Sequence, residues 1–120
     1  MLVRSALLVV TLLPGPVLAE GFEPVHEEDR FLELVRDRVL RLALYDLSIK
    51  VRPDGMIEGS AMGRTITGTW DWQDGYFCRE MDWSGTEIAY NCQLVEAKDG
   101  GVLRFTVDQG KGASASFRLR

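Results

Sequence analysis

Residues 64–95 read RTITGTWDWQDGYFCREMDWSGTEIAYNCQLV, and this stretch decides the fold. Apolar and polar residues alternate along much of it, and the turn sequences Gln73-Asp74-Gly75 and Ser84-Gly85 interrupt the alternation. A period of two residues is typical of a half-buried strand, and short glycine-bearing turns join antiparallel strands. The stretch therefore predicts three consecutive antiparallel strands: Arg64–Trp72, Tyr76–Trp83 and Thr86–Val95.

The same pattern continues on both sides of this stretch. Further strands are expected at Arg41–Val51, Met56–Met62, Val102–Asp108 and Ser114–Arg120. Alternation slips by one residue near Tyr45-Asp46, which we interpret as a β-bulge. Seven or so strands at a spacing of about 10 residues predict a mainly β fold. Because open sheet edges invite aggregation, we expect an antiparallel meander that curls into a small up-and-down, barrel-like sheet.

One helix is expected before the strands. Glu27-Glu28-Asp29 is followed by Phe31, Leu34 and Val35 at helical spacing, with arginines toward the end of the segment. Acidic residues in the first turn and basic residues in the last turn suit the helix dipole. The segment predicts one amphipathic helix over about residues 27–38, which either plugs one end of the sheet or covers one face.

The first 19 residues match a secretory signal peptide. Arg4 precedes the apolar run 7–13, Pro14-Gly15-Pro16 ends that run, and Ala19 occupies the expected cleavage position. A membrane-spanning helix needs about 20 apolar residues, so that alternative is disfavoured; a buried core helix is the other. We expect cleavage after Ala19, a single β-rich domain over residues 20–120, and a periplasmic or secreted location.

Cys78 and Cys92 are the only two cysteines. An oxidising compartment favours a disulfide between them, whereas redox-active pairs usually have C-x-x-C spacing. A three-residue loop Ser84-Gly85-Thr86 would pair Trp83 with Glu87 and, counting outward, Cys78 with Cys92. Residues directly opposite each other on antiparallel strands lie near disulfide distance. We therefore predict a structural disulfide.

Charge and composition exclude several function classes. The chain has 18 acidic and 14 basic side chains, and loss of Arg4 with the signal peptide changes the net charge from −4 to −5. Such a chain is not expected to bind nucleic acid or, after cleavage, a membrane. A single histidine, His26, cannot supply a zinc site or a Ser-His-Asp triad. We expect no catalytic residues, no metal and no cofactor.

Acidic residues along one hairpin have two interpretations. Asp71, Asp74, Glu80 and Asp82 cluster in sequence, and two carboxylates at a suitable distance can act as acid and base in a glycosidase. The competing interpretation, which we favour, is the solvent-exposed face of an antiparallel strand.

Aromatic residues give the strongest binding signal. Alternation places Phe77, Arg79, Met81 and Trp83 on one strand face, and aromatic stripes with an arginine suit a ligand cup or a protein contact. The competing interpretation is that the aromatic residues fill the core, above all at Trp70 and Phe77. An arginine on an apolar face needs a carboxylate or a ligand anion, and Glu87, Glu96 or Asp108 could supply the carboxylate. The candidate ligand-binding residues are Trp72, Arg79, Trp83 and Tyr90.

The chain resembles a family of small exported proteins from alphaproteobacteria. The resemblance rests on residues 68–79 (GTWDWQDGYFCR), 81–85 (MDWSG), 90–93 (YNCQ), 104–106 (RFT) and 117–120 (FRLR). Members often carry the label dihydrodipicolinate reductase, so the resemblance implies that activity. Enzymes with that activity resemble Rossmann folds with a G-x-G-x-x-G turn. This sequence has no such turn, and we interpret the label as a misannotation.

These observations predict a non-enzymatic, monomeric binding or interaction module whose partner is a small ligand or a periplasmic protein. The alternatives are an enzyme, either the labelled reductase or a carboxylate-based hydrolase, and a structural envelope factor. A bound small ligand would indicate the binding module, and a bound nicotinamide would indicate the reductase. Self-association would indicate the structural factor.

Overall fold

A computed structural model describes Ala6, residues 8–10 and residues 21–120. The expected signal peptide, residues 1–19, therefore lies largely outside the described residues. Among the residues described, no helix is long and apolar enough to cross a membrane.

The described chain is mainly β, as the sequence predicts, with nine strands in one sheet. The strands are β1 (Glu23–Val25), β2 (Leu40–Leu42), β3 (Leu47–Val51), β4 (Met56–Ala61), β5 (Arg64–Gln73), β6 (Tyr76–Trp83), β7 (Thr86–Lys98), β8 (Val102–Thr106) and β9 (Ser114–Leu119). The remaining elements are α1 (Glu28–Val35), the 3₁₀ turn η2 (Ala43–Tyr45) and the short helical segment α2 (Val107–Gly110).

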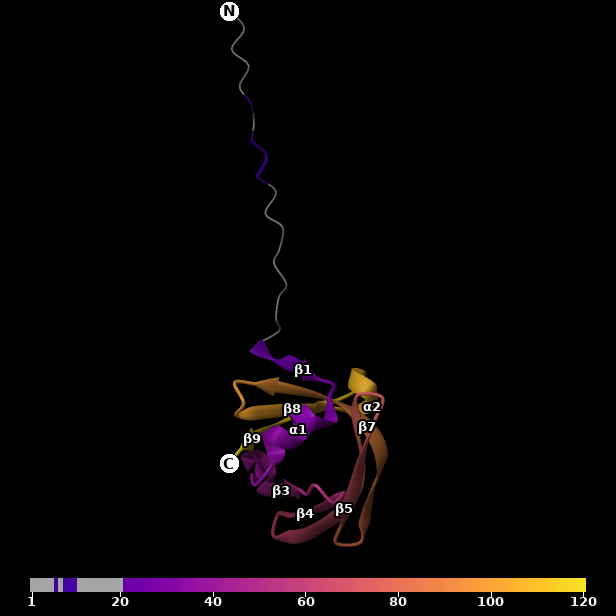
Figure 1. Cartoon of the computed structure of the whole chain (residues 1–120). Coiled ribbons are helices and arrows are strands. Elements are labelled where there is room, and N and C mark those ends of the chain that lie inside the picture. Colours follow the sequence, from indigo (N-terminus) through magenta and orange to yellow (C-terminus); the bar gives the residue numbers. More distant parts are fainter. Residues whose placement is uncertain (1–5, 7, 11–20) are drawn as a thin grey trace, which may run out of the picture.

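The sheet closes into an antiparallel barrel (Figure 1). Each strand from β2 to β9 pairs with the next one along the chain, and β9 returns to pair with β2. The closing pair is short and joins Leu40 to Leu119 and Arg41 to Arg118. β1 pairs with the C-terminal part of β7, at residues 95–97, and is not a member of the ring. Closure removes the open edges that a flat meander would expose.

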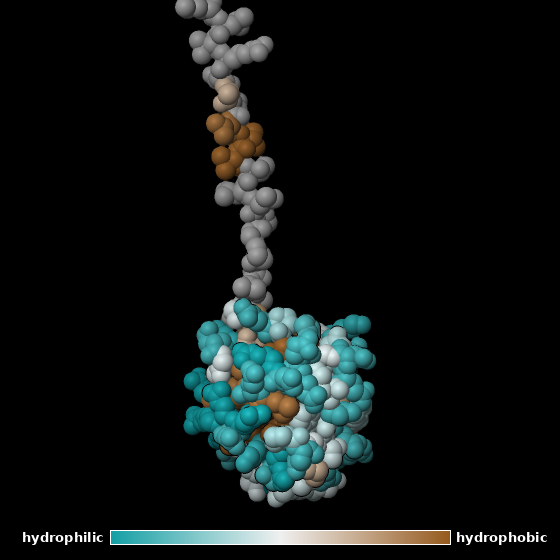
Figure 2. Space-filling view, viewed as in Figure 1, coloured by the Kyte–Doolittle hydropathy of each residue, from teal (hydrophilic) through white to brown (hydrophobic). Residues whose placement is uncertain are grey.

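α1 plugs one end of the barrel, which is the first of the two placements expected (Figure 1). Phe31, Leu34 and Val35 are buried, and the Phe31 ring lies 5.0–6.3 Å from the rings of four inward-facing aromatic residues on β5, β6 and β8. The helix is shorter than the expected 27–38. It ends at Val35 because Arg36 has an extended ψ of 126° and Asp37 a positive φ of 55°. Figure 2 shows a mainly hydrophilic face over this end, with a smaller apolar area between polar side chains.

The meander gives the barrel two different ends. Turns 52–55, 74–75 and 99–101 lie at the end that α1 plugs, where Gly75 is close to His26 in the segment leading into α1. The opposite end is formed by η2, the turns 62–63 and 84–85, and α2. Antiparallel neighbours alternate in direction, so every second connection falls at the same end. We call these the closed end and the open end.

The β6–β7 hairpin differs from the expected three-residue loop. The loop has two residues, Ser84-Gly85, and Trp83 pairs with Thr86 rather than with Glu87. Both loop residues have positive φ, 48° and 96°, as a two-residue hairpin turn of the primed type requires. A three-residue loop would be needed only if the ladder between the turn and the cysteines were regular, and the observed ladder is not.

A β-bulge restores the predicted cysteine pairing. Register shifts by one residue between the pair Met81–Ile88 and the pair Arg79–Asn91, and Cys78 then lies directly opposite Cys92. The two cysteines form the predicted disulfide, with a Cα–Cα distance of 3.9 Å. The offset that a two-residue loop creates is thus absorbed by one extra residue on β7.

The phase slip near Tyr45-Asp46 is not a bulge. The chain leaves β2, makes the 3₁₀ turn η2, and enters β3 after Asp46 in the left-handed region with φ 45°. The expected strand Arg41–Val51 is therefore two strands that form a tight hairpin, β2 with β3. Together with β1, this division accounts for nine strands where about seven were expected.

Candidate functional site

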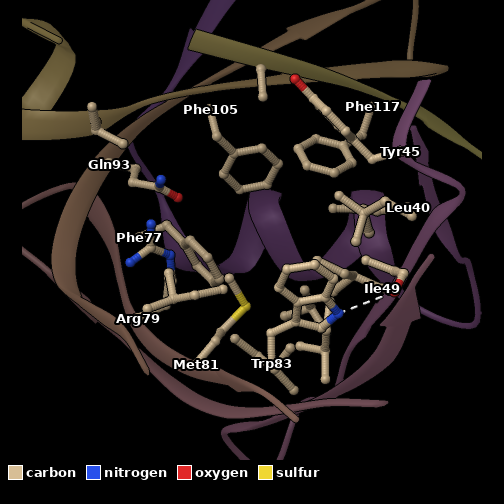
Figure 3. A pocket seen from close by; sticks show the side chains of 18 of the residues that line it. Leu40, Tyr45, Ile49, Phe77, Arg79, Met81, Trp83, Gln93, Phe105 and Phe117 are labelled. Atoms are coloured by element: carbon tan, nitrogen blue, oxygen red, sulfur yellow. Dashed lines mark hydrogen bonds between the residues drawn. The ribbon is translucent and has the colours of Figure 1, made fainter. Parts of the chain in front are cut away.

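The barrel encloses a cavity of about 440 Å³ that reaches the open end (Figure 3). Figure 3 shows α1 behind the cavity, and the aromatic residues Phe77 and Phe105, which line the cavity, also contact Phe31 of the helix. Exposed Tyr45 and Met62 border the cavity at the open end. The walls are lined by Leu40, Tyr45, Leu47, Ile49, Val51, Ile57, Ala61, Met62, Ile66, Phe77, Arg79, Met81, Trp83, Ile88, Gln93, Phe105, Val107, Ala113, Ser114, Ala115 and Phe117. These residues come from every strand of the ring.

The lining is apolar apart from a few groups. Of the described residues that line the cavity, Arg79 alone carries a formal charge, and Gln93, Ser114, Tyr45 and Trp83 have polar side-chain atoms. Ser114 shares a hydrogen bond of 2.7 Å with Thr106 between the hydroxyl oxygens. Arg79 and Gln93 are the buried polar residues among those that line the cavity.

Arg79 projects inward because of its position on β6. Phe77, Arg79, Met81 and Trp83 occupy alternate positions and line the cavity, as the alternation predicts. Arg79 is only 9% exposed, and burial lowers the pKa of its guanidinium below its ordinary value. The lowered pKa means that the apolar surroundings disfavour the charged form of the guanidinium.

The bulge provides the hydrogen-bond acceptor for Arg79. Ala89 lies between the two pairs where register shifts, so it has no regular partner on β6. The Nη1 of Arg79 donates a hydrogen bond of 2.7 Å to the carbonyl oxygen of Ala89. Bulges often re-aim backbone groups beside functional sites, and this one turns a carbonyl toward a buried arginine.

The carboxylates considered from the sequence are used elsewhere or do not reach Arg79. Glu96 forms an ion pair of 3.1 Å with Arg104, and Asp108 accepts a hydrogen bond of 2.7 Å from the side-chain amide of Asn91. Glu87 is exposed on β7, opposite Asp82. Within the described residues, no carboxylate oxygen lies within 4.0 Å of the Arg79 guanidinium, although other arginines form such pairs.

Gln93 lies beside Arg79 on the neighbouring strand. It pairs with Phe77 in the β6–β7 ladder, is 8% exposed, and lines the same cavity (Figure 3). An amide has both donors and acceptors, so Gln93 adds hydrogen-bonding capacity next to the charge. Gln93 is not among the residues that the sequence predicted for the site, although the register of the cysteines sets it opposite Phe77 and so on this face.

Trp83 forms part of the wall near the open end. Its Nε1 donates a hydrogen bond of 3.0 Å to the carbonyl oxygen of Ala61, and the Arg64 guanidinium lies 5.0 Å from its ring centroid. These contacts hold the indole in place while one part of it borders the cavity. The structure thus brings two of the four candidate residues, Arg79 and Trp83, into one cavity.

Trp72 and Tyr90 lie elsewhere. Trp72 is at the closed end, where its ring centroid lies 5.0 Å from that of Phe31 and its Nε1 donates a hydrogen bond of 2.9 Å to the carbonyl oxygen of His26. Tyr90 is 52% exposed, and its hydroxyl lies 3.6 Å from the Sγ of Cys92. Neither residue lines the cavity.

The acidic hairpin residues do not form a site with the cavity. Asp71 accepts a hydrogen bond from Gln73, and the Asp82 carboxylate caps the turn by accepting from the backbone N–H of Gly85. In the part of the chain that the structure describes, no group of three or more histidine, cysteine, aspartate or glutamate side chains is arranged to hold a metal ion.

Comparisons with protein-family models, with curated proteins and with solved structures give no match to this chain. Function must therefore be inferred from the barrel's own side chains. The cavity, its open end and its single charged residue are the features that bear on it.

Proposed function

We propose that the protein is a non-enzymatic binding module that holds a small, largely apolar molecule inside its barrel. The observation that carries the proposal is the cavity of about 440 Å³, enclosed by the ring of strands and open at one end. Small-molecule sites are typically concave, mostly apolar, and about 300–1,000 Å³ in volume. This cavity has all three properties.

The distribution of aromatic residues supports the view that the cavity serves binding and is not a packing defect. Protein interiors are normally close-packed, and an unfilled apolar space lowers stability. At the closed end Phe31 and its aromatic neighbours fill the barrel, whereas near the open end Ala61, Ala113 and Ala115 line the wall with small side chains. Space is therefore left on the side where a ligand can enter.

The lining also supports binding rather than catalysis. General acid–base and nucleophilic mechanisms use histidine, carboxylate, cysteine or activated hydroxyl groups in hydrogen-bonded sets. The described lining residues include no histidine, cysteine, aspartate or glutamate. Ser114, the one serine among them, shares a hydrogen bond with the Thr106 hydroxyl and not with a side chain that could act as a general base.

The proposed place of action is the periplasm or the extracellular space. The disulfide between Cys78 and Cys92 supports this location because disulfides persist in oxidising compartments. The signal-peptide pattern of residues 1–19 points the same way.

An occlusion experiment tests the proposal. The protein is recovered from a bacterial periplasm, and binding of N-phenylnaphthylamine, an uncharged fluorophore, is titrated by fluorescence. Ala115→Phe places a ring in the cavity, whereas Ser116→Phe places the same ring on the outer face of the same strand. We expect wild type and Ser116→Phe to bind alike and Ala115→Phe to bind at least about tenfold more weakly, a loss of about 1.4 kcal/mol.

Two results would contradict the proposal. Absence of probe binding to wild type would remove the cavity as a site, and equal binding by both folded phenylalanine variants would place the probe elsewhere. The mass of the recovered protein tests the location, because export predicts a chain that begins at Glu20.

A further inference from the structure

Arg79 carries a positive charge that the described chain does not neutralise. Moving a charge out of water is costly unless it is paired, and proteins usually pair such groups. The guanidinium has five N–H donors, and the structure provides one acceptor, the carbonyl oxygen of Ala89. No described side-chain nitrogen or oxygen is both inaccessible and without a hydrogen-bond partner. Nε and Nη2 of Arg79 donate no hydrogen bond to a described residue, so both atoms are accessible, and the space that Arg79 lines is the cavity.

The charge lies in the interior rather than at the mouth. β6 runs from Tyr76 at the closed end to Trp83 at the open end, and its inward residues follow in the order Phe77, Arg79, Met81, Trp83. Arg79 is four residues from Trp83, or about 13 Å along the strand at about 3.3 Å per residue. The guanidinium contacts Ala89, which lies between the levels of Arg79 and Met81. A group that meets it therefore lies inside the cavity, beyond Trp83 at the open end.

The surroundings of Arg79 define the chemistry that fits there. One guanidinium with the Gln93 amide beside it matches one planar anion, since arginine pairs with carboxylates through two parallel hydrogen bonds. No second cation lines the described cavity to balance a doubly charged phosphate. The remainder of the molecule must be apolar to match Met81, Trp83 and Ile88.

We infer that the ligand is an apolar monocarboxylate that binds acid-first, with its carboxylate against Arg79 and Gln93 and its apolar part toward the open end. This inference rests on the binding function proposed above and adds the chemical class and the orientation of the ligand. The carboxylate supplies the counter-ion that the described residues do not provide at Arg79, and the Ala89 carbonyl holds the guanidinium in position for it.

The test compares ligands that differ only in the head group. Decanoate, decanol and decylammonium are titrated calorimetrically into wild type, Arg79→Met and Arg118→Met. The last variant is the matched control, because Arg118 is exposed on the outer face of β9. Hydrogen bonds to charged groups contribute about 1.5–3 kcal/mol, so wild type and Arg118→Met should bind decanoate at least about tenfold more tightly than decanol. Arg79→Met should lose this preference and keep its affinity for decanol within about threefold.

Each other result has a definite meaning. If wild type binds decanol as tightly as decanoate, or prefers decylammonium, the inferred ligand class is wrong while the cavity function stands. A preference for decanoate that survives in Arg79→Met would overturn the role of Arg79. If wild type binds none of the three and also fails to bind N-phenylnaphthylamine, the proposed function itself fails. Binding of N-phenylnaphthylamine by Arg79→Met shows that this variant is folded.

Discussion

At the scale of single residues, Arg79 combines a structural cost with the ligand-binding role proposed for it. It occupies an inward position among apolar neighbours, and burial lowers its pKa. Because the pKa of this base is lower in the folded state than in the unfolded state, the folded protein holds the proton less tightly. Below the lowered pKa both states are charged, and the penalty is fully present; it is relieved only as the pH rises through that pKa. Such costs are common at binding sites, where function takes precedence over stability.

The first stability prediction concerns Arg79→Met in the absence of ligand. Methionine fills a similar volume without a charge, so the free energy of unfolding should rise by about 1 kcal/mol, even though the Ala89 carbonyl loses its donor. Urea unfolding at neutral pH measures the change, and Arg118→Met should stay within about 0.5 kcal/mol of wild type. A clear loss of stability in Arg79→Met would mean that the chain, rather than a ligand, stabilises the charge.

At the scale of elements, the β6–β7 hairpin shows how turn, bulge and disulfide act together. The two-residue turn sets one register, the bulge at Ala89 shifts it by one residue, and the Cys78–Cys92 bond joins the strands just beyond the shift. The bulge lies between the turn and the disulfide, so the covalent bond limits slippage of the strands. The same bulge presents the carbonyl that holds Arg79.

The second stability prediction is the effect of removing the disulfide. The two cysteines are 14 residues apart, and closing a loop of about 15 residues contributes about 3 kcal/mol in the chain-entropy model. The double variant Cys78→Ala/Cys92→Ala should lose about that much in urea unfolding. Dithiothreitol should destabilise wild type and leave the double variant unchanged. If dithiothreitol destabilised both proteins equally, its effect would not come from reduction of the Cys78–Cys92 disulfide.

At the scale of the whole molecule, closure and plugging together create the cavity. The pairing of β9 with β2 converts a meander into a ring, and α1 fills one end of that ring. Phe31 is fully buried, with its ring centroid 5.0–5.7 Å from those of Trp70, Trp72 and Phe77. The plug therefore packs against aromatic residues of β5 and β6, two of the strands that form the cavity walls.

The third stability prediction concerns this anchor. Phe31→Ala removes a buried ring and leaves a void under the cavity, so it should lower the free energy of unfolding by about 3–5 kcal/mol. Glu33→Ala, on the exposed side of α1, is the control and should change it by less than about 0.5 kcal/mol. Thermal and urea unfolding measure both. A small effect of Phe31→Ala would indicate that the barrel does not depend on its plug.

Part of the site followed from local pattern. Alternation along β6 placed Arg79 and Trp83 on the inward face, since side chains of a strand point to opposite sides in turn. Trp72 obeys the same rule but lies at the closed end, and Tyr90 lies beside the bulge with its side chain exposed. Alternation gives the face of a strand, whereas position along the barrel axis depends on which end the helix occupies.

The sequence by itself determined most of the strands, the pairing of the two cysteines and the face on which Arg79 lies, because each depends on neighbouring residues or on one hairpin. It did not determine the two-residue turn at Ser84-Gly85, the bulge on β7 or the division of residues 41–51 into two strands. Only the tertiary structure decided that β9 closes on β2, that α1 plugs one end, and that Arg79 faces an open cavity with no carboxylate of the described residues within 4.0 Å. Those features depend on contacts between residues far apart in the chain. The energies of those contacts depend on the curvature of the whole sheet, which no single segment of the sequence determines.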